Sequence, residues 1–159
     1  RTNPSKVRAK DTPEFLLFSK WGKVVDEMEE ITDYTDYILK VIDHLNLDSL
    51  ITIGGDDTLS YSARLVKEGI KLNAIPKTMD NDVLGTEYCI GFSTAVTQAV
   101  NLISNFRTSI GSHERIGVIE LFGRNSGETA LITGYLSYVD RTIICEVPFN
   151  MQEVAELLA

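Results

Sequence analysis

Residues 50–75 restrict the fold more than any other part of the sequence, because two apolar runs there flank a helical repeat. The runs 50–53 and 72–75 are short, apolar and bounded by polar or turn residues, as buried strands are. Between them, apolar residues recur at helical spacing up to Gly69, whose position suits the end of a helix. A strand, a helix and a strand joined by short loops are typical of a parallel βαβ unit.

The same alternation continues on both sides of this unit. The spacing of apolar residues predicts further helices over 34–45, 95–110 and 126–138 and from residue 154, and further strands over 116–121 and 142–147. These elements predict an α/β protein with a Rossmann-like, three-layer parallel sheet that carries helices on both faces. We expect residues 1–159 to form a single α/β domain, incomplete at both ends, with a core over 31–150 and a poorly defined segment over 1–30.

The composition argues against several other classes of protein. With 43% hydrophobic residues, the chain has enough apolar material to form a core rather than stay disordered. A net charge of -8 argues against nucleic-acid binding, which normally needs a basic surface. No apolar run approaches the roughly 20 residues that cross a bilayer. Cys89 and Cys145 are too few for a disulfide framework, so we expect a cytoplasmic protein without a nucleic-acid or membrane partner.

A first polar motif, Gly54-Gly55-Asp56-Asp57-Thr58, directly follows the strand predicted over 50–53. Glycines allow backbone N–H groups to approach an anion, and the start of a helix adds a favourable field. Two adjacent carboxylates would repel a phosphate there unless a divalent cation lay between them. The motif therefore predicts a metal–phosphate site, although a tight connection between strand and helix would use the same glycines.

A second motif follows the strand predicted over 72–75 and includes Lys77, Asp80 and Asp82. Lys77 can meet a phosphate as a point charge. The two aspartates can divide a base role from a metal-binding or orienting role, because neighbouring carboxylates push each other's pKa values apart. A capped loop without function is the alternative, since Asp and Asn are common in turns.

Two arginines, Arg115 and Arg124, flank the strand predicted over 116–121. The guanidinium group suits bidentate binding of phosphate. Because one strand's length separates them, the two side chains would serve different places, such as sites in different subunits. Surface salt bridges are the alternative for each arginine.

Taken together, these motifs resemble the phosphofructokinase family, especially its pyrophosphate-dependent branch. The resemblance covers about two thirds of the chain, from residue 51 to about 149. It rests on four motifs in the family's order: Gly54-Gly55-Asp56-Asp57-Thr58, Pro76-Lys77-Thr78-Met79-Asp80-Asn81-Asp82, Gly91-Phe92, and His113-Glu114-Arg115 through Gly123-Arg124. The start of the chain, Arg1-Thr2-Asn3-Pro4, also resembles the segment after an early glycine-rich phosphate loop in pyrophosphate-type enzymes. The implied fold is a fragment of the family's large N-terminal domain.

The resemblance implies catalytic roles in the loop 77–82. Asp80 would be the general base that takes the proton from the 1-hydroxyl of fructose 6-phosphate. Thr78 would hold the transferred phosphoryl group or the sugar beside it, and Asp82 would support the base and the metal. Lys77 would neutralise developing charge together with Mg²⁺, the implied cofactor.

Binding roles are implied for positions in the other motifs. Asp56 would hold Mg²⁺ directly or through water, and Arg115 would reach the sugar's 6-phosphate, typically in a neighbouring subunit's site of a homo-oligomer. The remaining contacts to fructose 6-phosphate would come from Phe122, Gly123 and Arg124, with Phe122 replacing the family's usual methionine. The phosphoryl donor would meet Gly54, Gly55, Asp57, Thr58 and Lys77.

Asp57 and Lys77 together favour pyrophosphate as the donor. ATP-dependent relatives usually have glycine at the position of Asp57, which leaves room for the nucleotide's α-phosphate, whereas lysine at position 77 is ambiguous alone. The implied reaction gives fructose 1,6-bisphosphate and phosphate, reversibly, as a step of glycolysis. An ATP-dependent 6-phosphofructokinase, a lipid or NAD kinase, and a non-catalytic regulatory chain are the alternatives. Because the early loop and the later substrate-binding half are absent, we expect the fragment to be inactive alone.

Overall fold

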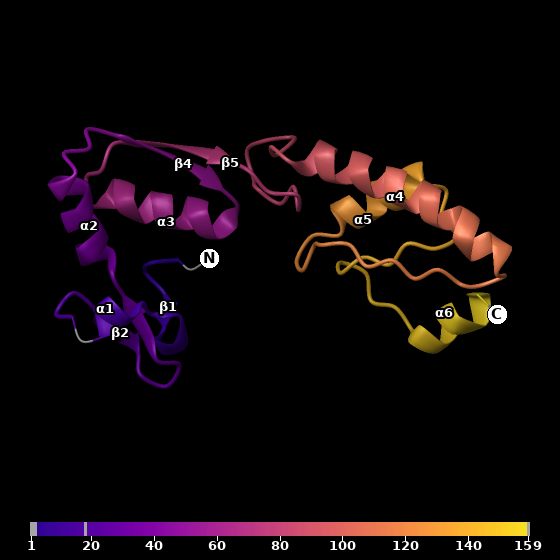
Figure 1. The fold of residues 1–159 in the computed structure, drawn as a ribbon, viewed down its shortest axis with the longest axis horizontal. Coiled ribbons are helices and arrows are strands. Elements are labelled where there is room, and N and C mark those ends of the chain that lie inside the picture. Colours follow the sequence, from indigo (N-terminus) through magenta and orange to yellow (C-terminus); the bar gives the residue numbers. More distant parts are fainter. Residues whose placement is uncertain (1–2, 18, 159) are drawn as a thin grey trace. The chain divides into compact units, whose positions relative to one another are not determined.

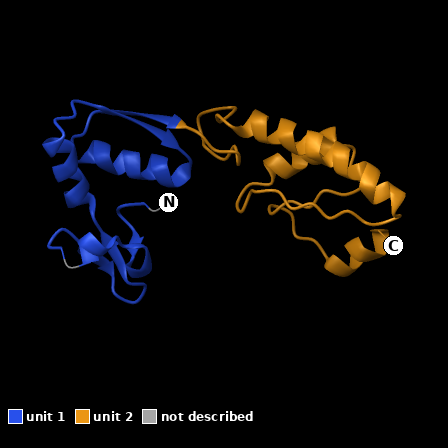
Figure 2. Ribbon diagram, in the orientation of Figure 1, with its two compact units in different colours: residues 1–75 blue, residues 76–159 orange. Residues whose placement is uncertain are grey.

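The computed structural model describes residues 3–17 and 19–158, which fall into two compact units, 1–75 and 76–159 (Figure 2). Each unit is described by itself below. Arg1 and Thr2, part of the predicted resemblance at the start of the chain, lie outside the described residues. The single domain expected over residues 1–159 stays a prediction.

The first part of unit 1 is a small antiparallel sheet with strand order β1-β3-β2. Figure 1 labels β1 and β2 of this sheet. Its elements are β1 (Val7–Arg8), η1 (Ala9–Asp11), α1 (Glu14–Leu17), β2 (Lys23–Asp26) and β3 (Ile31–Asp33). Thr32 is the common partner of Val7 and Val24 in the register. Val7, Leu16 and Tyr34 pack together as a small core. Much of the segment that the sequence left undefined therefore has regular structure.

Helix α2 (Thr35–His44) follows and confirms the helix predicted over 34–45. An Asp33 carboxylate oxygen accepts hydrogen bonds from the backbone N–H and the hydroxyl of Thr35, which fixes the start of the helix. Ile42 lies on the buried side of α2.

The predicted βαβ unit is present as β4 (Leu50–Gly54), α3 (Asp56–Lys67) and β5 (Leu72–Pro76). The strands β4 and β5 pair and run parallel, with α3 as the crossover (Figure 1). Leu65 of α3 is buried, and the hydroxyls of Ser62 and Thr52 are 2.7 Å apart where α3 covers β4. Gly69 adopts a φ of 91°, as expected for the residue that ends this helix.

Unit 2 is built around the contact of α4 (Phe92–Ser112) with α5 (Glu128–Leu136), and α6 (Met151–Leu158) follows. Phe92, Val96, Ala99 and Ile103 are the buried residues of α4. The helices predicted over 95–110 and 126–138 and from residue 154 are confirmed. Across the described ranges 3–17 and 19–158, every helix is too short or too polar to traverse a lipid bilayer.

The strands predicted over 116–121 and 142–147 are wrong, because neither segment takes part in a strand ladder. Val118 is 87% exposed and Ile143 is 41% exposed. An apolar, β-branched run forms a strand only where neighbouring strands satisfy its backbone groups and cover its side chains. Within the described residues the parallel sheet is limited to β4 and β5, with one isolated parallel bridge between Lys77 and Ile90.

Candidate functional site

The first predicted motif lies where the carboxyl end of β4 meets the N-terminus of α3. Gly55 is the extended residue before the helix, and its carbonyl accepts a hydrogen bond from the Thr58 N–H at 3.0 Å. Asp56 and Asp57 occupy the first turn of α3, and both are exposed. The first N–H groups of a helix have no carbonyl partner within it, so this turn is a suitable place for an anion. The metal–phosphate site itself stays a prediction.

Gly54 is the position in this motif that tolerates no side chain. It is buried, and a Cβ there would lie 2.6 Å from the Cβ of Thr58. We expect Gly54→Ala to lower the free energy of unfolding by about 1–3 kcal/mol, because the stiff β-branched threonine cannot move aside. Urea denaturation measures the change. Gly111→Ala is the control: its site within α4 is open, so it should be neutral or stabilising by about 0.4–1 kcal/mol. Equal losses in both variants would contradict the close approach.

The carboxylates of this motif fit a cation that is bound together with phosphate. Among the described residues, no three His, Cys, Asp or Glu side chains gather as a metal-binding cluster. Mg²⁺ in phosphoryl-transfer sites is held by one or two carboxylates, with waters and substrate phosphates completing the shell. Asp56, exposed at the helix N-terminus, can supply such a carboxylate, and its role as the Mg²⁺ ligand stays a prediction.

The second motif forms the loop 77–82, which we call the catalytic loop after the roles predicted for its residues. Lys77 follows β5 directly, and beside it the Ile90 N–H donates a 3.2 Å hydrogen bond to the Pro76 carbonyl. The Asp80 N–H donates to the Thr78 hydroxyl at 3.1 Å. Asp80 is half-buried, and its Oδ1 atom is buried without a hydrogen-bond partner among the described residues. Lys77 and Asp82 are exposed.

Asn81 organises the turn of the catalytic loop, although the sequence-based prediction gave it no role. Its φ of 52° is left-handed, a conformation that Asn adopts more readily than most residues. Its Oδ1 accepts from the Cys89 N–H at 2.7 Å, and its Nδ2 donates to the Glu87 carbonyl at 3.0 Å. The same Nδ2 donates to Glu128 Oε1 of α5 at 3.1 Å.

Residues 126–129, which lead into α5 and form its first residues, contact the catalytic loop through two buried hydroxyls. Ser126 Oγ donates to the Asp80 carbonyl at 2.7 Å, and Thr129 Oγ1 donates to the Met79 carbonyl. The sequence-based prediction missed both residues. Their spacing of three, at the start of a predicted helix, was the signal that could have indicated a polar helix face turned inward.

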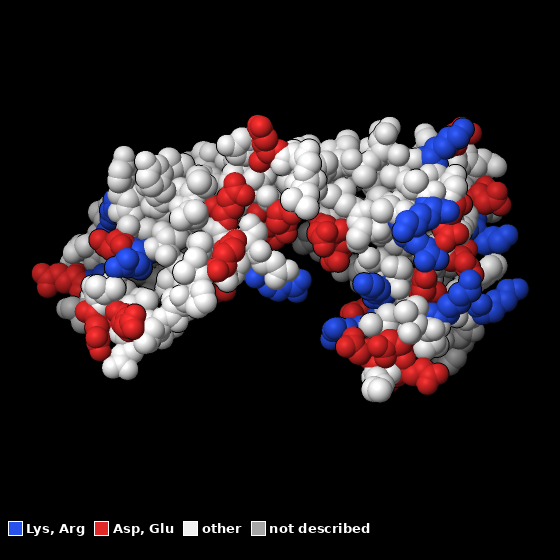
Figure 3. Space-filling view, turned by 180° about the vertical axis from the view of Figure 1, so that it is seen from behind, with Lys and Arg blue, Asp and Glu red and all other residues white. Residues whose placement is uncertain are grey.

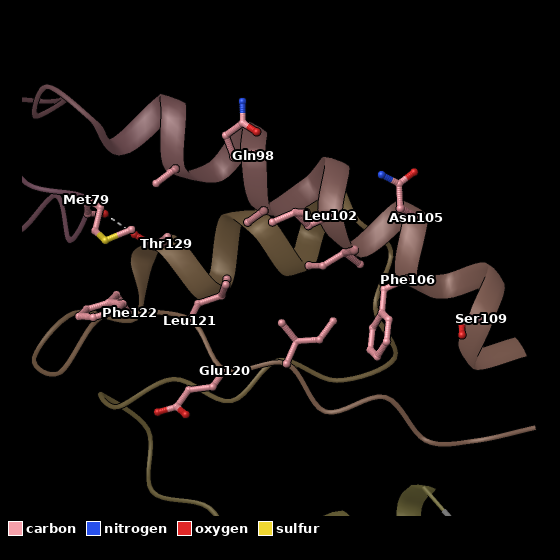
Figure 4. A pocket seen from close by; sticks show the side chains of 14 residues that line it. Met79, Gln98, Leu102, Asn105, Phe106, Ser109, Glu120, Leu121, Phe122 and Thr129 are labelled. Atoms are coloured by element: carbon pink, nitrogen blue, oxygen red, sulfur yellow. Dashed lines mark hydrogen bonds between the residues drawn. The ribbon is translucent and has the colours of Figure 1, made fainter. Parts of the chain in front are cut away.

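The other residues predicted to contact fructose 6-phosphate lie in unit 2, as the catalytic loop does. Phe122 is exposed, and with Met79 and Thr129 it lines an apolar cavity of about 750 Å³ beside α4 (Figure 4). Gly123 has a φ of 136°, and a Cβ there would collide with the Ser126 carbonyl, so this turn requires glycine. Arg124, next in the chain, is exposed.

Arg115 stands apart from Arg124 along the chain, at the other end of the extended segment 116–121. Its backbone N–H donates to the Ile110 carbonyl at 3.2 Å, which attaches it to the C-terminal end of α4. Its side chain is exposed. The prediction that the two arginines serve different places assumed a strand over 116–121, which is absent from the described residues, and it stays a prediction.

Glu146 lies outside α5, and its carboxylate accepts a hydrogen bond from a backbone N–H at the N-terminus of that helix. Its Oε1 accepts from the Gly127 N–H at 2.7 Å, and this hydrogen bond holds the pKa of Glu146 below its usual range. A carboxylate at this position also interacts favourably with the helix dipole. Glu146 was likewise absent from the sequence-based prediction.

The predicted site residues are divided between the two units. The predicted catalytic and sugar-binding residues all belong to unit 2: Lys77, Thr78, Asp80, Asp82, Arg115, Phe122, Gly123 and Arg124. The motif 54–58, which is predicted to bind the phosphoryl donor and includes the predicted Mg²⁺ ligand Asp56, belongs to unit 1. We call it the donor motif. On the face shown in Figure 3, basic side chains are interspersed with acidic ones. The individual roles, and the expectation that nucleic acid is not a partner, stay predictions.

Comparisons with known proteins identify the family. The sequence model described as phosphofructokinase matches residues 16–159. The pyrophosphate–fructose 6-phosphate 1-phosphotransferase of Thermoproteus tenax is 46% identical over 117 residues, which cover 72% of this chain and 34% of the relative. An ATP-dependent 6-phosphofructokinase of Persephonella marina is 47% identical over 111 residues, which cover 69% of this chain and 34% of the relative. The chain thus spans about a third of the length of these curated relatives.

The fold agrees with this result. The crystal structure of Pichia pastoris phosphofructokinase in the T-state matches with a TM-score of 0.69 and 27% identity, over 76% of this chain and 14% of that one. The match confirms the predicted α/β class and the fragment of a phosphofructokinase fold. Because the family's sequence model extends through both units, the chain belongs to the phosphofructokinase family.

Proposed function

We propose that this chain supplies the catalytic loop and the donor motif of a pyrophosphate-dependent 6-phosphofructokinase. The observation that carries the proposal is the buried, unpartnered carboxylate oxygen of Asp80, in a loop that directly follows β5. Ligands of parallel α/β sheets bind at this edge, beyond the carboxyl ends of the strands. Buried polar atoms without a partner are rare in native structures, and a catalytic role is one explanation for such an atom.

The proposed reaction transfers a phosphoryl group from pyrophosphate to the 1-hydroxyl of fructose 6-phosphate. Asp80 accepts the hydroxyl proton as the sugar oxygen attacks phosphorus, and inorganic phosphate leaves. Lys77 offsets charge on the phosphates, while Thr78 and Asp82 orient the transferred group and the base. When bound with the donor, Mg²⁺ would supply further charge neutralisation, and Asp56 would hold it. Phosphoryl transfer depends mainly on such positioning and electrostatics.

Pyrophosphate is favoured over ATP by Asp57. Its carboxylate is exposed in the first turn of α3, where a nucleotide's α-phosphate would meet both its bulk and its negative charge. The names of relatives do not resolve the donor. The two reported above are pyrophosphate-dependent and ATP-dependent at similar identity, and ATP-dependent names are more numerous among the matches. An ATP-dependent enzyme is therefore the second candidate.

The exposed Arg115 supports an assembly of several copies. Its side chain has no role in the predicted site of its own chain, whereas a neighbouring copy's sugar 6-phosphate would offer a partner for its guanidinium. We therefore include a homo-oligomer with shared sites in the proposal.

The donor can be tested on the intact natural protein with fructose 6-phosphate, Mg²⁺ and either pyrophosphate or ATP. We expect fructose 1,6-bisphosphate to form with pyrophosphate, and the reverse reaction to run with inorganic phosphate. Turnover with ATP instead would contradict the donor assignment and leave the role of Asp80 intact. Inactivity with both donors would favour a regulatory chain without catalytic function.

A further inference from the structure

Three successive residues of the catalytic loop are held by the start of α5. The Met79 carbonyl accepts from Thr129 Oγ1, a contact drawn as a dashed line in Figure 4. The Asp80 carbonyl accepts from Ser126 Oγ at 2.7 Å, and the Asn81 amide donates to Glu128 Oε1 at 3.1 Å. We call these three hydrogen bonds the α5 clamp.

The clamp is buried on its helix side. Thr129 is 1% exposed and Ser126 is 8% exposed, so water does not compete for their hydroxyls. Neither hydroxyl has a carbonyl four residues earlier within α5, which begins at Glu128, whereas the exposed Thr97 and Ser104 of α4 each donate to such a carbonyl of their own helix. Ser126 and Thr129 instead point at the loop.

The helix that carries the clamp is itself fixed. It packs against α4, and Glu146 holds the N–H of Gly127 at its N-terminus. The loop has no regular secondary structure of its own between Lys77 and Asp82. Hydrogen bonds from a fixed helix to a loop transfer the rigidity of the helix to the loop backbone.

We propose that the α5 clamp sets the position of the Asp80 carboxylate, which makes Ser126 and Thr129 positioning residues for the reaction. This inference rests on the proposed function, because it assumes that Asp80 acts on the substrate. Displacement of a reacting group by about 1 Å can cost about a hundredfold in rate. Loss of one of the three bonds, with the other two retained, should cost less.

The experiment compares substitutions at two threonines on one face of α5. Thr129→Val removes the hydroxyl and keeps the shape, whereas Thr129→Ser keeps the hydroxyl. Thr133→Val is the matched control: Thr133 is fully buried one turn further along, and its hydroxyl has no partner among the described residues. In the intact protein we expect kcat to fall about tenfold in Thr129→Val, with KM nearly unchanged. The kcat values of Thr129→Ser and Thr133→Val should stay within about twofold of the wild-type kcat.

Hydrogen exchange of the backbone amides in residues 79–82 provides a second readout that does not depend on activity. Thr129→Val should speed their exchange, and Thr133→Val should not. Equal kcat values in Thr129→Val and Thr133→Val would overturn the inference, as would unchanged exchange in both. If the wild-type protein turned over fructose 6-phosphate with neither donor, the proposed function would fail, and with it the catalytic part of the inference. Exchange would then still decide whether the clamp holds the loop.

Discussion

Asp80→Asn is expected to lower kcat of the intact protein at least about a hundredfold, because asparagine cannot take the proton from the 1-hydroxyl. A hundredfold loss corresponds to about 3 kcal/mol of activation free energy. Asparagine has nearly the same shape, so the loop hydrogen bonds made by the Asp80 backbone to Thr78 and Ser126 should persist. KM for fructose 6-phosphate should therefore change much less than kcat. The loss would identify the carboxylate, and not the loop as a whole, as the acting group.

Asp140→Asn is the matched control for this measurement. Asp140 is an exposed carboxylate in the same unit, four residues beyond the end of α5, and it belongs to none of the predicted motifs. Its substitution removes the same charge and should leave kcat unchanged. Steady-state rates with saturating pyrophosphate would compare the two. A rate for Asp80→Asn close to wild type would refute the assignment of the base, whatever the donor.

The elements predicted correctly are those whose signal is local. Helix α4 and the β4–α3–β5 unit follow from the spacing of apolar residues and from turn glycines such as Gly69, so a short window of sequence defines them. The strands of the antiparallel sheet are two to four residues long, as in Val7–Arg8, and carry too little alternation to be recognised. The strand predicted over 116–121 failed because strand formation depends on partners that sequence spacing does not specify.

The residues of the candidate site also fall into two groups: those with a local sequence signal and those that depend on distant partners. The positions of Asp57 at a helix start and of Asp80 in the loop after β5 were predictable, since both follow apolar runs that end in Gly or Pro. The hydroxyls of Ser126 and Thr129 were not, because they reach residues 46 and 50 positions away. Contacts at such separations depend on tertiary packing, and neither hydroxyl has a sequence signal that names its partner.

Asp57→Gly is expected to allow the intact protein to use ATP while retaining its use of pyrophosphate. Two like charges about 4 Å apart repel by about 1 kcal/mol in water and about 4 kcal/mol at the effective dielectric of a protein surface. Removing the carboxylate should therefore raise the ratio of kcat/KM for ATP to that for pyrophosphate by at least about tenfold. The helix itself should survive, since glycine costs about 0.5–1 kcal/mol even in a helix interior and position 57 lies in the first turn of α3.

Asp57→Asn separates the two properties of this side chain. It keeps the bulk and removes the charge, so a gain of ATP use in both variants would assign donor choice to electrostatic repulsion. A gain in Asp57→Gly alone would assign it to space. Both outcomes would establish position 57 as the donor gate, because either property excludes an α-phosphate at the start of α3. An unchanged ratio in both variants would place the choice of donor elsewhere in the protein and remove the main support for pyrophosphate.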